Sequence, residues 1–481
     1  MIFFSVVYKV CILILKMGLS LEFILAQDCF KVIEMIKKQI LILWKTLKGT
    51  YSKERYCYNQ LYACTSDERK LLDFQMDHLR KLLLHAYQYV PFYSERLKNI
   101  INDGNLDLHG FNGIALLTKE DIRKHGEKLS SKDISTRKWF YNSSGGSTGE
   151  PVRFIQDDLF SRWSGASDRI YYENIVGIDE LTVKKLMLWG SERDIFKSTM
   201  GWREKLLRWL NNIKFLNSFR MSEKDMEEYV KIINSYKPDL IRAYAGSLYE
   251  ISRFIEKKRT NIHRPKVIVC SAEKLRMEMR EKIESTFGTK VYDYYGSREV
   301  DGIAGECSAG LLHIFMFDKY VEVLNERNCS VREEEMGKIV VTTLHNYSMP
   351  LVRFEIGDTA ILGPRKCKCG NLLPTLKDVT GRITDHFIRE DGTIIYGEYF
   401  THLFYLKDWV KSFCIIQEDY RNIRILVTLR GNVNEAEKRE IEIKIKLVMG
   451  KDCKIAWEFV EEIPPTRSGK HIYTKSLLYH I

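Results

Sequence analysis

The chain has little proline and no repeated or low-complexity tract, and both absences restrict its class. Only 9 of its 481 residues are proline, no internal repeat is visible, and 45% of the residues are hydrophobic. This composition excludes a collagen-like, repeat or disordered protein and predicts a folded globular chain. Since 481 residues exceed the length at which one hydrophobic core usually stops growing, we expect two or more domains.

Cysteines do not occur in the pattern of a disulfide framework. The 11 cysteines are an odd number, and they are scattered singly except for Cys367 and Cys369. Such usage is typical of a protein in a reducing compartment, and we therefore expect the cytoplasm.

The sequence also lacks an uninterrupted apolar run long enough to span a membrane. Lys9 and Lys16 divide the apolar start into pieces shorter than the roughly 20 residues that a spanning helix needs, and no signal-peptide pattern is clear. Residues 30–47 then place apolar residues at helical spacing, with lysines between them. Two interpretations stay open: an interfacial helix making peripheral contact with the inner membrane surface, or a docked helix ending at Gly49. We treat residues 1–50 as an N-terminal extension.

Basic residues are in excess, with a formal net charge of +11. This charge favours anionic partners such as nucleotides, coenzyme A or acidic lipid. The basic residues are spread along the chain without a recognised nucleic-acid-binding motif, so no nucleic acid partner is expected.

Strand and helix patterns alternate through the middle of the chain. Residues 184–190 and 265–273 read as buried strands, and residues 225–236, 247–259 and 276–288 read as helices. This alternation predicts an α/β fold with a largely parallel sheet, whose ligands bind at the carboxyl ends of the strands. Strand patterns dominate residues 311–363, and short strands surround one helix after residue 385. We expect a large domain over 51–385 with mixed sheets, and a small α+β domain over 386–481.

Five polar stretches follow one another in a fixed order: SSGGSTGEP (143–151), YYGSREVDG (294–302), LVRFEIGD (351–358), GRITD (381–385) and PPTRSGK (464–470). The first suits phosphate binding through backbone N–H groups and hydroxyls, although no Gly-Lys-Ser/Thr follows as in a Walker loop. In this order the stretches resemble the adenylate-forming superfamily of acyl-CoA synthetases. The likeness is to its phenylacetate-CoA ligase-like and CapK-like capsule-biosynthesis members, and it runs from about residue 65 to the end.

The resemblance implies that the chain binds ATP with Mg²⁺ and that the small domain is mobile. The residues it assigns to nucleotide binding are Ser144, Gly145, Gly146, Ser147, Thr148, Gly149, Ser271, Ala272, Glu273, Tyr294, Tyr295, Gly296, Ser297, Arg298, Asp358, Arg382 and Lys470. Tyr295 would stack on adenine, Asp358 would accept from the ribose hydroxyls at a strand end, and Glu299 would bind Mg²⁺. Lys470, Glu299 and Arg382 would carry catalysis, with Lys470 stabilising charge between the carboxylate and the α-phosphate. Gly145, Glu150 and Arg298 depart from the usual family residues.

Cys307, His313, Cys367 and Cys369 form a second candidate site. Three cysteines and one histidine make a set suited to tetrahedral zinc, and CKCG is typical of a metal-binding turn. The alternative is that reduced cysteines simply pack in the interior. A structural zinc is expected here, not a catalytic one.

The resemblance implies an AMP-forming acid–thiol ligase. It would adenylate a small carboxylic acid, pass the acyl group to coenzyme A, and serve capsular or cell-surface polysaccharide synthesis. Two alternatives stay open: transfer of the acyl group to a carrier protein or a sugar amine, and a nucleotide-binding homologue without turnover. The identity of the acid is not legible in the sequence.

Overall fold

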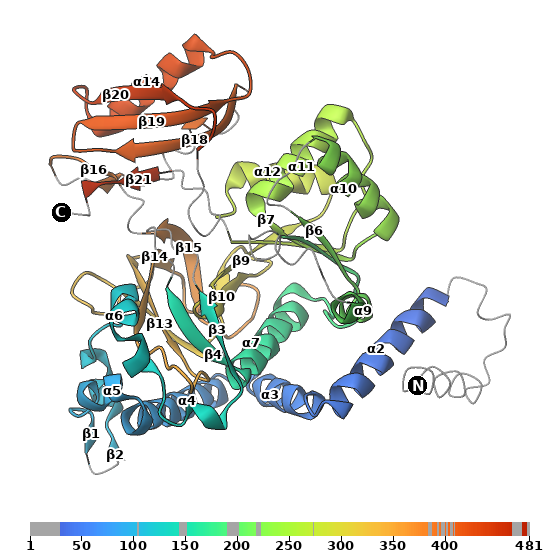
Figure 1. Cartoon of the computed structure of the whole chain (residues 1–481), viewed down its shortest axis with the longest axis vertical. Helices are drawn as coiled ribbons and strands as arrows, with labels where there is room; N and C mark the ends of the chain where they lie inside the picture. The colour runs from blue at the N-terminus through green and yellow to red at the C-terminus, as the bar shows by residue number, and fades with distance from the viewer. Residues whose placement is uncertain are drawn as a thin grey trace. The chain divides into compact units, whose positions relative to one another are not determined.

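The structure is a computed structural model of the chain (Figure 1). It describes residues 29–102, 105–143, 152–189, 202–217, 223–272, 274–382, 387–391, 394–395, 400, 403–404, 407, 409–463 and 474–478. These residues divide into two compact units. The first consists mainly of residues 29–68 and 162–294, and the second of residues 69–161, 295–304 and the chain from 311 onward.

The first unit contains a parallel sheet with the strand order β6-β5-β7-β8-β9. Its strands are β5 (Lys185–Trp189), β6 (Ile213–Asn217), β7 (Leu240–Tyr244), β8 (Val267–Ser271) and β9 (Val291–Ser297), the last continuing into the second unit. Every residue of β8 is buried, as expected for a parallel strand covered on both faces. The predicted parallel sheet is confirmed.

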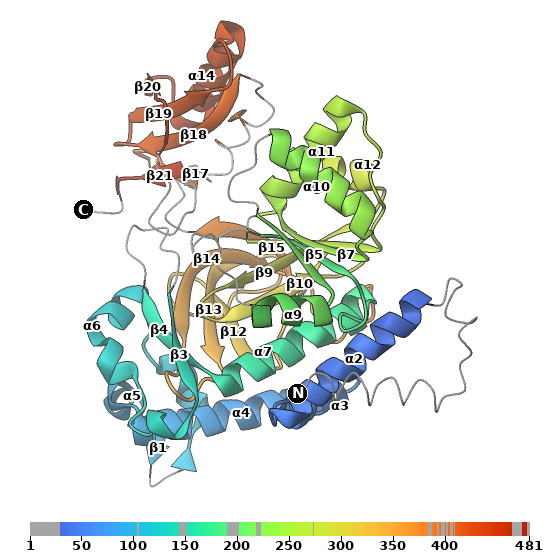
Figure 2. The ribbon, with the colours of Figure 1, turned by 45° about the vertical axis from the view of Figure 1, so that its right-hand side comes forward.

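Helices α10 (Glu223–Tyr236), α11 (Ala245–Lys258) and α12 (Met277–Phe287) alternate with these strands and gather on one face of the sheet (Figure 2). Helix α11 buries residues at helical spacing, including Leu248, Ile251, Ser252 and Ile255. The other helices of this unit are α2 (Cys29–Leu47), α3 (Tyr51–Cys64), most of α7 (Asp158–Ile170), the π-helical turn Tyr171–Val176 and α9 (Trp202–Leu210). The predicted helices at 225–236, 247–259 and 276–288 are thus confirmed.

Helix α2 is docked on its own unit and leaves a few apolar side chains exposed. Leu41 is buried, and the Lys37 ammonium donates to Asn212 Oδ1 at 2.8 Å and lies over the Trp209 ring. Leu47, in contrast, is 72% exposed. Among the described residues, no helix is both long and apolar enough to cross a membrane.

The second unit opens with helices α4 (Glu68–Tyr89), α5 (Pro91–Arg96) and α6 (Lys119–Leu129), two 3₁₀ turns (Leu108–Gly113, Ile134–Thr136), and two hairpins. The hairpins are β1 (Ile101–Asn102) with β2 (Asn105–Leu106), and β3 (Trp139–Ser143) with β4 (Arg153–Asp157). An antiparallel array follows, formed by β10 (Asp301–Glu306), β11 (Leu312–Ile314), β12 (Lys319–Leu324), β13 (Met336–Thr343), β14 (Phe354–Leu362) and β15 (Thr375–Arg382). Within it β11 pairs with β15, β15 with β14, β14 with β13 and β13 with β12. The expected strand-rich region is confirmed.

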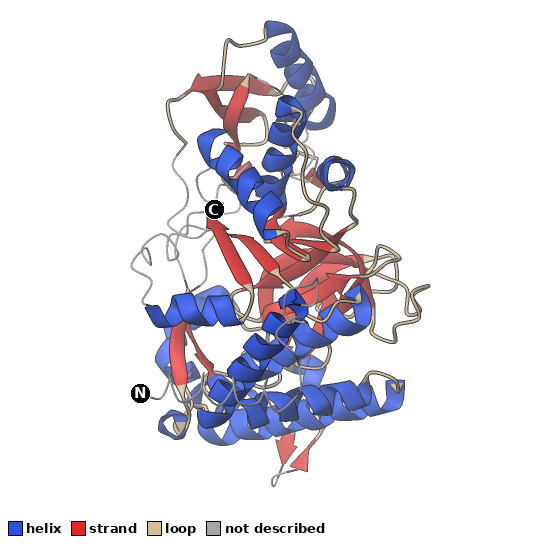
Figure 3. Cartoon of the chain, turned by 90° about the vertical axis from the view of Figure 1, so that its right-hand side faces the viewer, coloured by secondary structure: helices blue, strands red, loops and turns tan. Residues whose placement is uncertain are grey.

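The C-terminal part combines a four-stranded sheet with one long helix. Figure 3 draws the strands of the chain in red and the helices in blue. The sheet order is β20-β19-β18-β21, with β18 (Val410–Gln417), β19 (Asn422–Leu429), β20 (Lys454–Phe459) and β21 (Thr474–Ser476); β16 (Phe387–Ile388) and β17 (Ile394–Ile395) form a small ladder. Helix α14 (Glu435–Met449) begins at Asn434, whose side chain accepts from two backbone N–H groups. Its Ile441, Ile445 and Met449 share a hydrophobic cluster with sheet residues such as Ile425. The small α+β arrangement is as expected, while the boundary at 385 stays a prediction.

Candidate functional site: a tyrosine–aspartate contact and a paired glutamate

The glycine- and serine-rich stretch connects the two strands of a hairpin. Strand β3 pairs with β4 in register from Trp139–Asp157 to Ser143–Arg153, and the Arg153 guanidinium lies 3.5 Å from the centre of the Tyr141 ring. Ser144, Gly145, Gly146, Ser147, Thr148 and Gly149 lie outside the described residues. Their expected phosphate contacts therefore stay a prediction.

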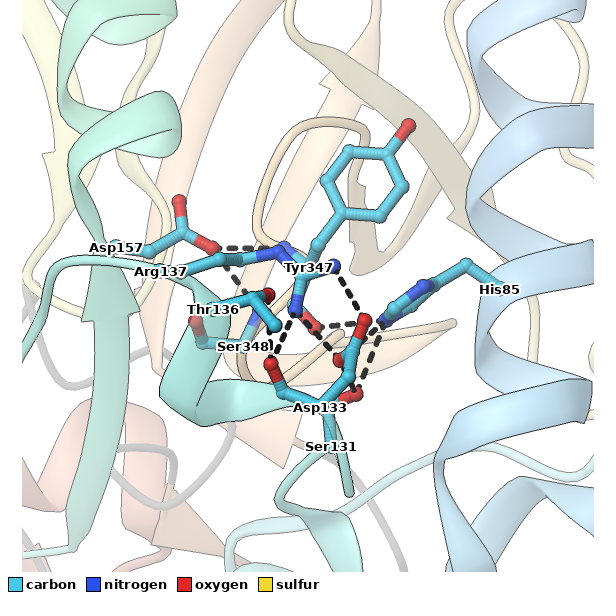
Figure 4. Close-up of polar contacts among 8 residues, drawn as sticks. All are labelled: His85, Ser131, Asp133, Thr136, Arg137, Asp157, Tyr347 and Ser348. Atoms are coloured by element: carbon cyan, nitrogen blue, oxygen red, sulfur yellow. Dashed lines mark hydrogen bonds and ion pairs between the residues drawn. The ribbon is translucent and has the colours of Figure 1, made fainter.

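A polar network fixes the chain just before β3 and at the end of β4 (Figure 4). Asp133 accepts from the Arg137 guanidinium at 2.6 and 2.8 Å, and the Ser131 hydroxyl also donates to Asp133. At the end of β4, Asp157 accepts from the backbone N–H groups of Tyr347 and Ser348, both at 3.0 Å. The chain just before β3 and the last residue of β4 are thus fixed by charge-assisted hydrogen bonds.

His85 completes the network from helix α4. Its Nε2 lies 2.9 Å from the Tyr347 carbonyl and 3.2 Å from the Ser131 hydroxyl. Burial lowers the pKa of His85, so the ring is neutral at pH 7. It holds the chain at Ser131 and Tyr347 through hydrogen bonds.

The YYGSRE stretch covers the end of β9 and the tight connection from β9 to β10. A Cβ atom on Gly296 would lie 2.6 Å from the Asp301 carbonyl oxygen and 2.9 Å from the Gly302 Cα. Glycine is therefore the residue that lets the chain approach itself this closely. The Gln156 side chain donates to the carbonyls of Arg298 (2.9 Å) and Glu299 (3.3 Å) and so fixes the backbone beyond Ser297.

Tyr295 and Asp358 are brought into direct contact. The Tyr295 hydroxyl donates to Asp358 Oδ2 at 2.7 Å, and Asp358 pairs in register with Arg382 on β15. Only the backbone of Arg382 is described, and its phosphate role stays a prediction. Two residues expected at the nucleoside, 63 positions apart in sequence, thus touch each other.

The expected position of Asp358 at a strand end is wrong. Asp358 lies inside β14, where the register with β13 shifts between Lys338 and Val340 and Gly357 has φ +91°. The positive φ creates a β-bulge, and a bulge redirects the following side chain without ending the strand. Gly357 does mark a change of direction, but inside the strand and not at its end.

Glu299 is buried and forms an ion pair that the sequence did not suggest. Its Oε1 lies 3.2 Å from the Lys119 ammonium, and the two side chains are 4% and 20% exposed respectively. Burial is the largest single influence and raises the pKa of Glu299, but the Lys119 charge and the hydrogen bonds from the backbone, Ser297 and Lys119 together lower the pKa overall. The carboxylate is therefore ionised at neutral pH, as a Mg²⁺ ligand must be. The stretch TKED signals the start of a helix, because Thr118 and Asp121 form the capping box that begins α6. It does not indicate that Lys119 pairs with Glu299.

Ser271 ends β8 and Ala272 follows it, while Tyr294 lies inside the neighbouring strand β9. Ser271 pairs in register with Tyr294, whose hydroxyl donates to Asp168, and Ala272 has φ +69°. A non-glycine residue in the left-handed region is strained, and such strain is frequent at binding sites. Glu273, Asp385 and Lys470 lie outside the described residues.

Cys307, His313, Cys367 and Cys369 come together as expected. Their ligand atoms all lie within 4.8 Å of one another, and Cys307 and His313 are buried. His313 Nδ1 lies 2.9 Å from the Leu373 carbonyl, which fixes the tautomer with the proton on Nδ1, and Nε2 lies 3.2 Å from Cys369 Sγ. The imidazole nitrogen without a proton is therefore directed toward the thiols.

The two cysteine turns repeat one design. Gly310 donates its N–H to the Cys307 carbonyl at 3.0 Å, and Gly370 donates to the Cys367 carbonyl at 3.1 Å; both glycines have φ +82°. Backbone N–H groups also point at sulfur, from Ala309 to Cys307 and from Asn371 to Cys369. Donors to sulfur stabilise thiolate, the form that binds metal. The donor set thus fits a Cys₃His zinc site.

The chain is similar to known proteins in sequence and in fold. Residues 387–476 match the family described as the CapK C-terminal domain. The chain is 24% identical to protein CapK of Staphylococcus aureus over 89% of this chain and 95% of that one. It is also 24% identical to phenylacetate-coenzyme A ligase of Thermus thermophilus, over 67% and 73% of the two chains. The fold resembles a crystal structure of 2-hydroxyisobutyryl-CoA ligase in the postadenylation state, with a TM-score of 0.64 at 17% identity over 86% and 90% of the chains. The chain is therefore similar in sequence to CapK and to phenylacetate-CoA ligase, and it shares the fold of an adenylate-forming CoA ligase.

Proposed function

We propose that the protein is an AMP-forming ligase that activates a carboxylic acid with ATP and passes the acyl group to coenzyme A. The observation that carries this proposal is the contact between Tyr295 and Asp358. An aromatic ring and a carboxylate, held together beside a bulge, offer the stacking surface and the diol acceptor that an adenosine needs. Relatives named as phenylacetate-CoA ligases support the thioester as product.

Mg²⁺ would be held at Glu299, whose buried carboxylate and the neighbouring Ser297 hydroxyl offer oxygen ligands. Such oxygens fit a hard cation, which would neutralise triphosphate charge. Arg382 and Lys470 would stabilise the charge that develops at the α-phosphate. Positioning two anions against each other is the main task of these side chains.

ATP–pyrophosphate exchange with a panel of aromatic, hydroxylated and aliphatic acids tests the proposal. We expect exchange with at least one acid, and its loss in Lys470→Ala with ATP affinity retained. Lys475→Ala, at an exposed position on β21, is the matched control and keeps activity. Near-normal exchange in Lys470→Ala would contradict the role of Lys470.

The acyl acceptor is decided by a second assay on the active acid. Coenzyme A is the proposed acceptor, and the likeness to CapK supports a place in polysaccharide assembly, where a sugar amine or a carrier protein would serve instead. Thioester formation supports the first, and amide formation the second. Nucleotide binding without exchange for any acid would support the homologue without turnover, to which Gly145, Glu150 and Arg298 point.

We also propose one structural zinc at Cys307, His313, Cys367 and Cys369. Support comes from the closeness of the four ligand atoms, the fixed His313 tautomer and the two matching turns. None of the four coincides with a residue assigned to ATP, so zinc would stabilise the strands and take no part in adenylation.

A further inference from the structure

Lys119 and Glu299 are each held in place by contacts other than their own ion pair. Lys119 is the first residue of α6, and the capping box of Thr118 and Asp121 fixes the start of that helix. The backbone at Glu299 is held by Gln156, which in turn accepts from Asn142 at 2.9 Å. Two anchored ends keep the ammonium and the carboxylate together without a ligand.

Lys119 and Glu299 form an ion pair between two largely buried side chains. The Lys119 nitrogen lies 3.2 Å from Glu299 Oε1, and the Ser297 hydroxyl lies beside the same carboxylate. An ammonium on a flexible stem, still 20% exposed, can withdraw toward solvent. A divalent cation that replaced it would gain both oxygens.

We infer that Lys119 is a resident counter-ion of Glu299, a positioning residue that keeps the carboxylate oriented and that the divalent metal must displace. This inference rests on the proposed function, in which Glu299 binds Mg²⁺. Since like charges repel strongly at short range in a buried site, Lys119 lowers the affinity for free metal. Metal loading then depends on a nucleotide that brings its own negative charge.

Mn²⁺ alone, followed by electron paramagnetic resonance on the full chain without nucleotide, tests the inference. We expect Lys119→Met to bind Mn²⁺ at least about tenfold more tightly than wild type, and Lys119→Arg, which keeps the charge, to bind as wild type does. The gain disappears in the double variant with Glu299→Gln, because the carboxylate is then absent. If Lys119 only stabilised the fold, Lys119→Met would bind Mn²⁺ more weakly than wild type. Tighter binding by the variant therefore separates the two roles.

Thermal unfolding gives a second readout. Mn²⁺ is expected to raise the Tm of Lys119→Met more than that of wild type, since the metal replaces the missing positive charge. If Lys119→Met does not fold, Lys119→Gln carries the same comparison, because its amide can still donate to the carboxylate. Equal or weaker Mn²⁺ affinity in the neutral variant overturns the inference. Absence of pyrophosphate exchange in wild type would instead count against the proposed function, and the Mn²⁺ comparison needs no turnover.

Discussion

At the scale of single residues, the contact between Tyr295 and Asp358 links two motifs that the sequence presents separately. A hydroxyl that donates to a charged carboxylate is a strong hydrogen bond and fixes the orientation of the acceptor. The resemblance assigned both residues to the nucleoside, but no pattern along the chain could show that they touch, because β9 and β14 are far apart in sequence.

Removing this hydroxyl is expected to weaken ATP binding. Tyr295→Phe keeps the ring for stacking and loses the hydrogen bond, so KM for ATP should rise about tenfold with a smaller change in kcat. The matched control is Tyr420→Phe, at an exposed tyrosine, which leaves KM unchanged. An unchanged KM in Tyr295→Phe would show that Asp358 is oriented without it.

Asp133 gives a prediction about pH. The Arg137 guanidinium and the Ser131 hydroxyl lower the pKa of Asp133 from 3.8 to about 2. The folded state thus binds this proton less readily than the unfolded state, so the contribution to stability is fully present above pH 4 and is lost as the pH falls toward 2. The Tm difference between wild type and Asp133→Asn should be constant from pH 7 to 5 and shrink below pH 4. A difference that grows on acidification would contradict this assignment.

At the scale of elements, hydrophobic periodicity predicted the helices and parallel strands well because each buries a regular set of side chains. Hydrophobic periodicity did not predict the irregular features. The bulge at Gly357 is a change of register between β13 and β14, and the pairing of Lys119 with Glu299 joins residues 180 positions apart. Both depend on how separate strands and helices meet, which local spacing does not encode.

The β9–β10 connection is expected to tolerate no side chain at its glycine. Gly296→Ala would place a Cβ against backbone atoms at 2.6–3.1 Å, so the hairpin must open, at a cost of about 1–3 kcal/mol of stability. Denaturant unfolding measures the loss, and nucleotide affinity should fall with it. Gly431→Ala, where no atom lies within 4 Å of the added Cβ, is the control and should stay within about 0.5 kcal/mol of wild type.

At the scale of the whole molecule, the order of the motifs indicated the resemblance to adenylate-forming acyl-CoA synthetases. The alternation of strands and helices predicted the α/β fold class. The boundary near residue 385 is a prediction that a fragment can test. Residues 387–453 contribute a separate hydrophobic cluster that includes Phe387, Trp409 and Ile445, so a fragment of residues 386–481 should fold alone. Circular dichroism with cooperative melting is the measurement, and a non-cooperative melt would place the boundary elsewhere.

Zinc content is a property of the whole molecule that the cysteine pattern predicts. We expect one zinc per chain by mass spectrometry, its loss in Cys367→Ser, and a Tm lower by at least about 5 °C after chelation. Cys329→Ser, at an exposed cysteine outside the cluster, is the matched control and keeps its zinc. A metal-free wild type with an unchanged melting curve would favour cysteines that simply pack.

The two matching cysteine turns also bear on how the protein should be handled. Cys367 and Cys369 are only partly buried, and their sulfur atoms lie close to that of Cys307. A sample stripped of metal in air would therefore hold neighbouring thiols ready to cross-link. Such oxidation would prevent the proposed zinc from binding, so we expect purification under reductant to be needed for the zinc measurement.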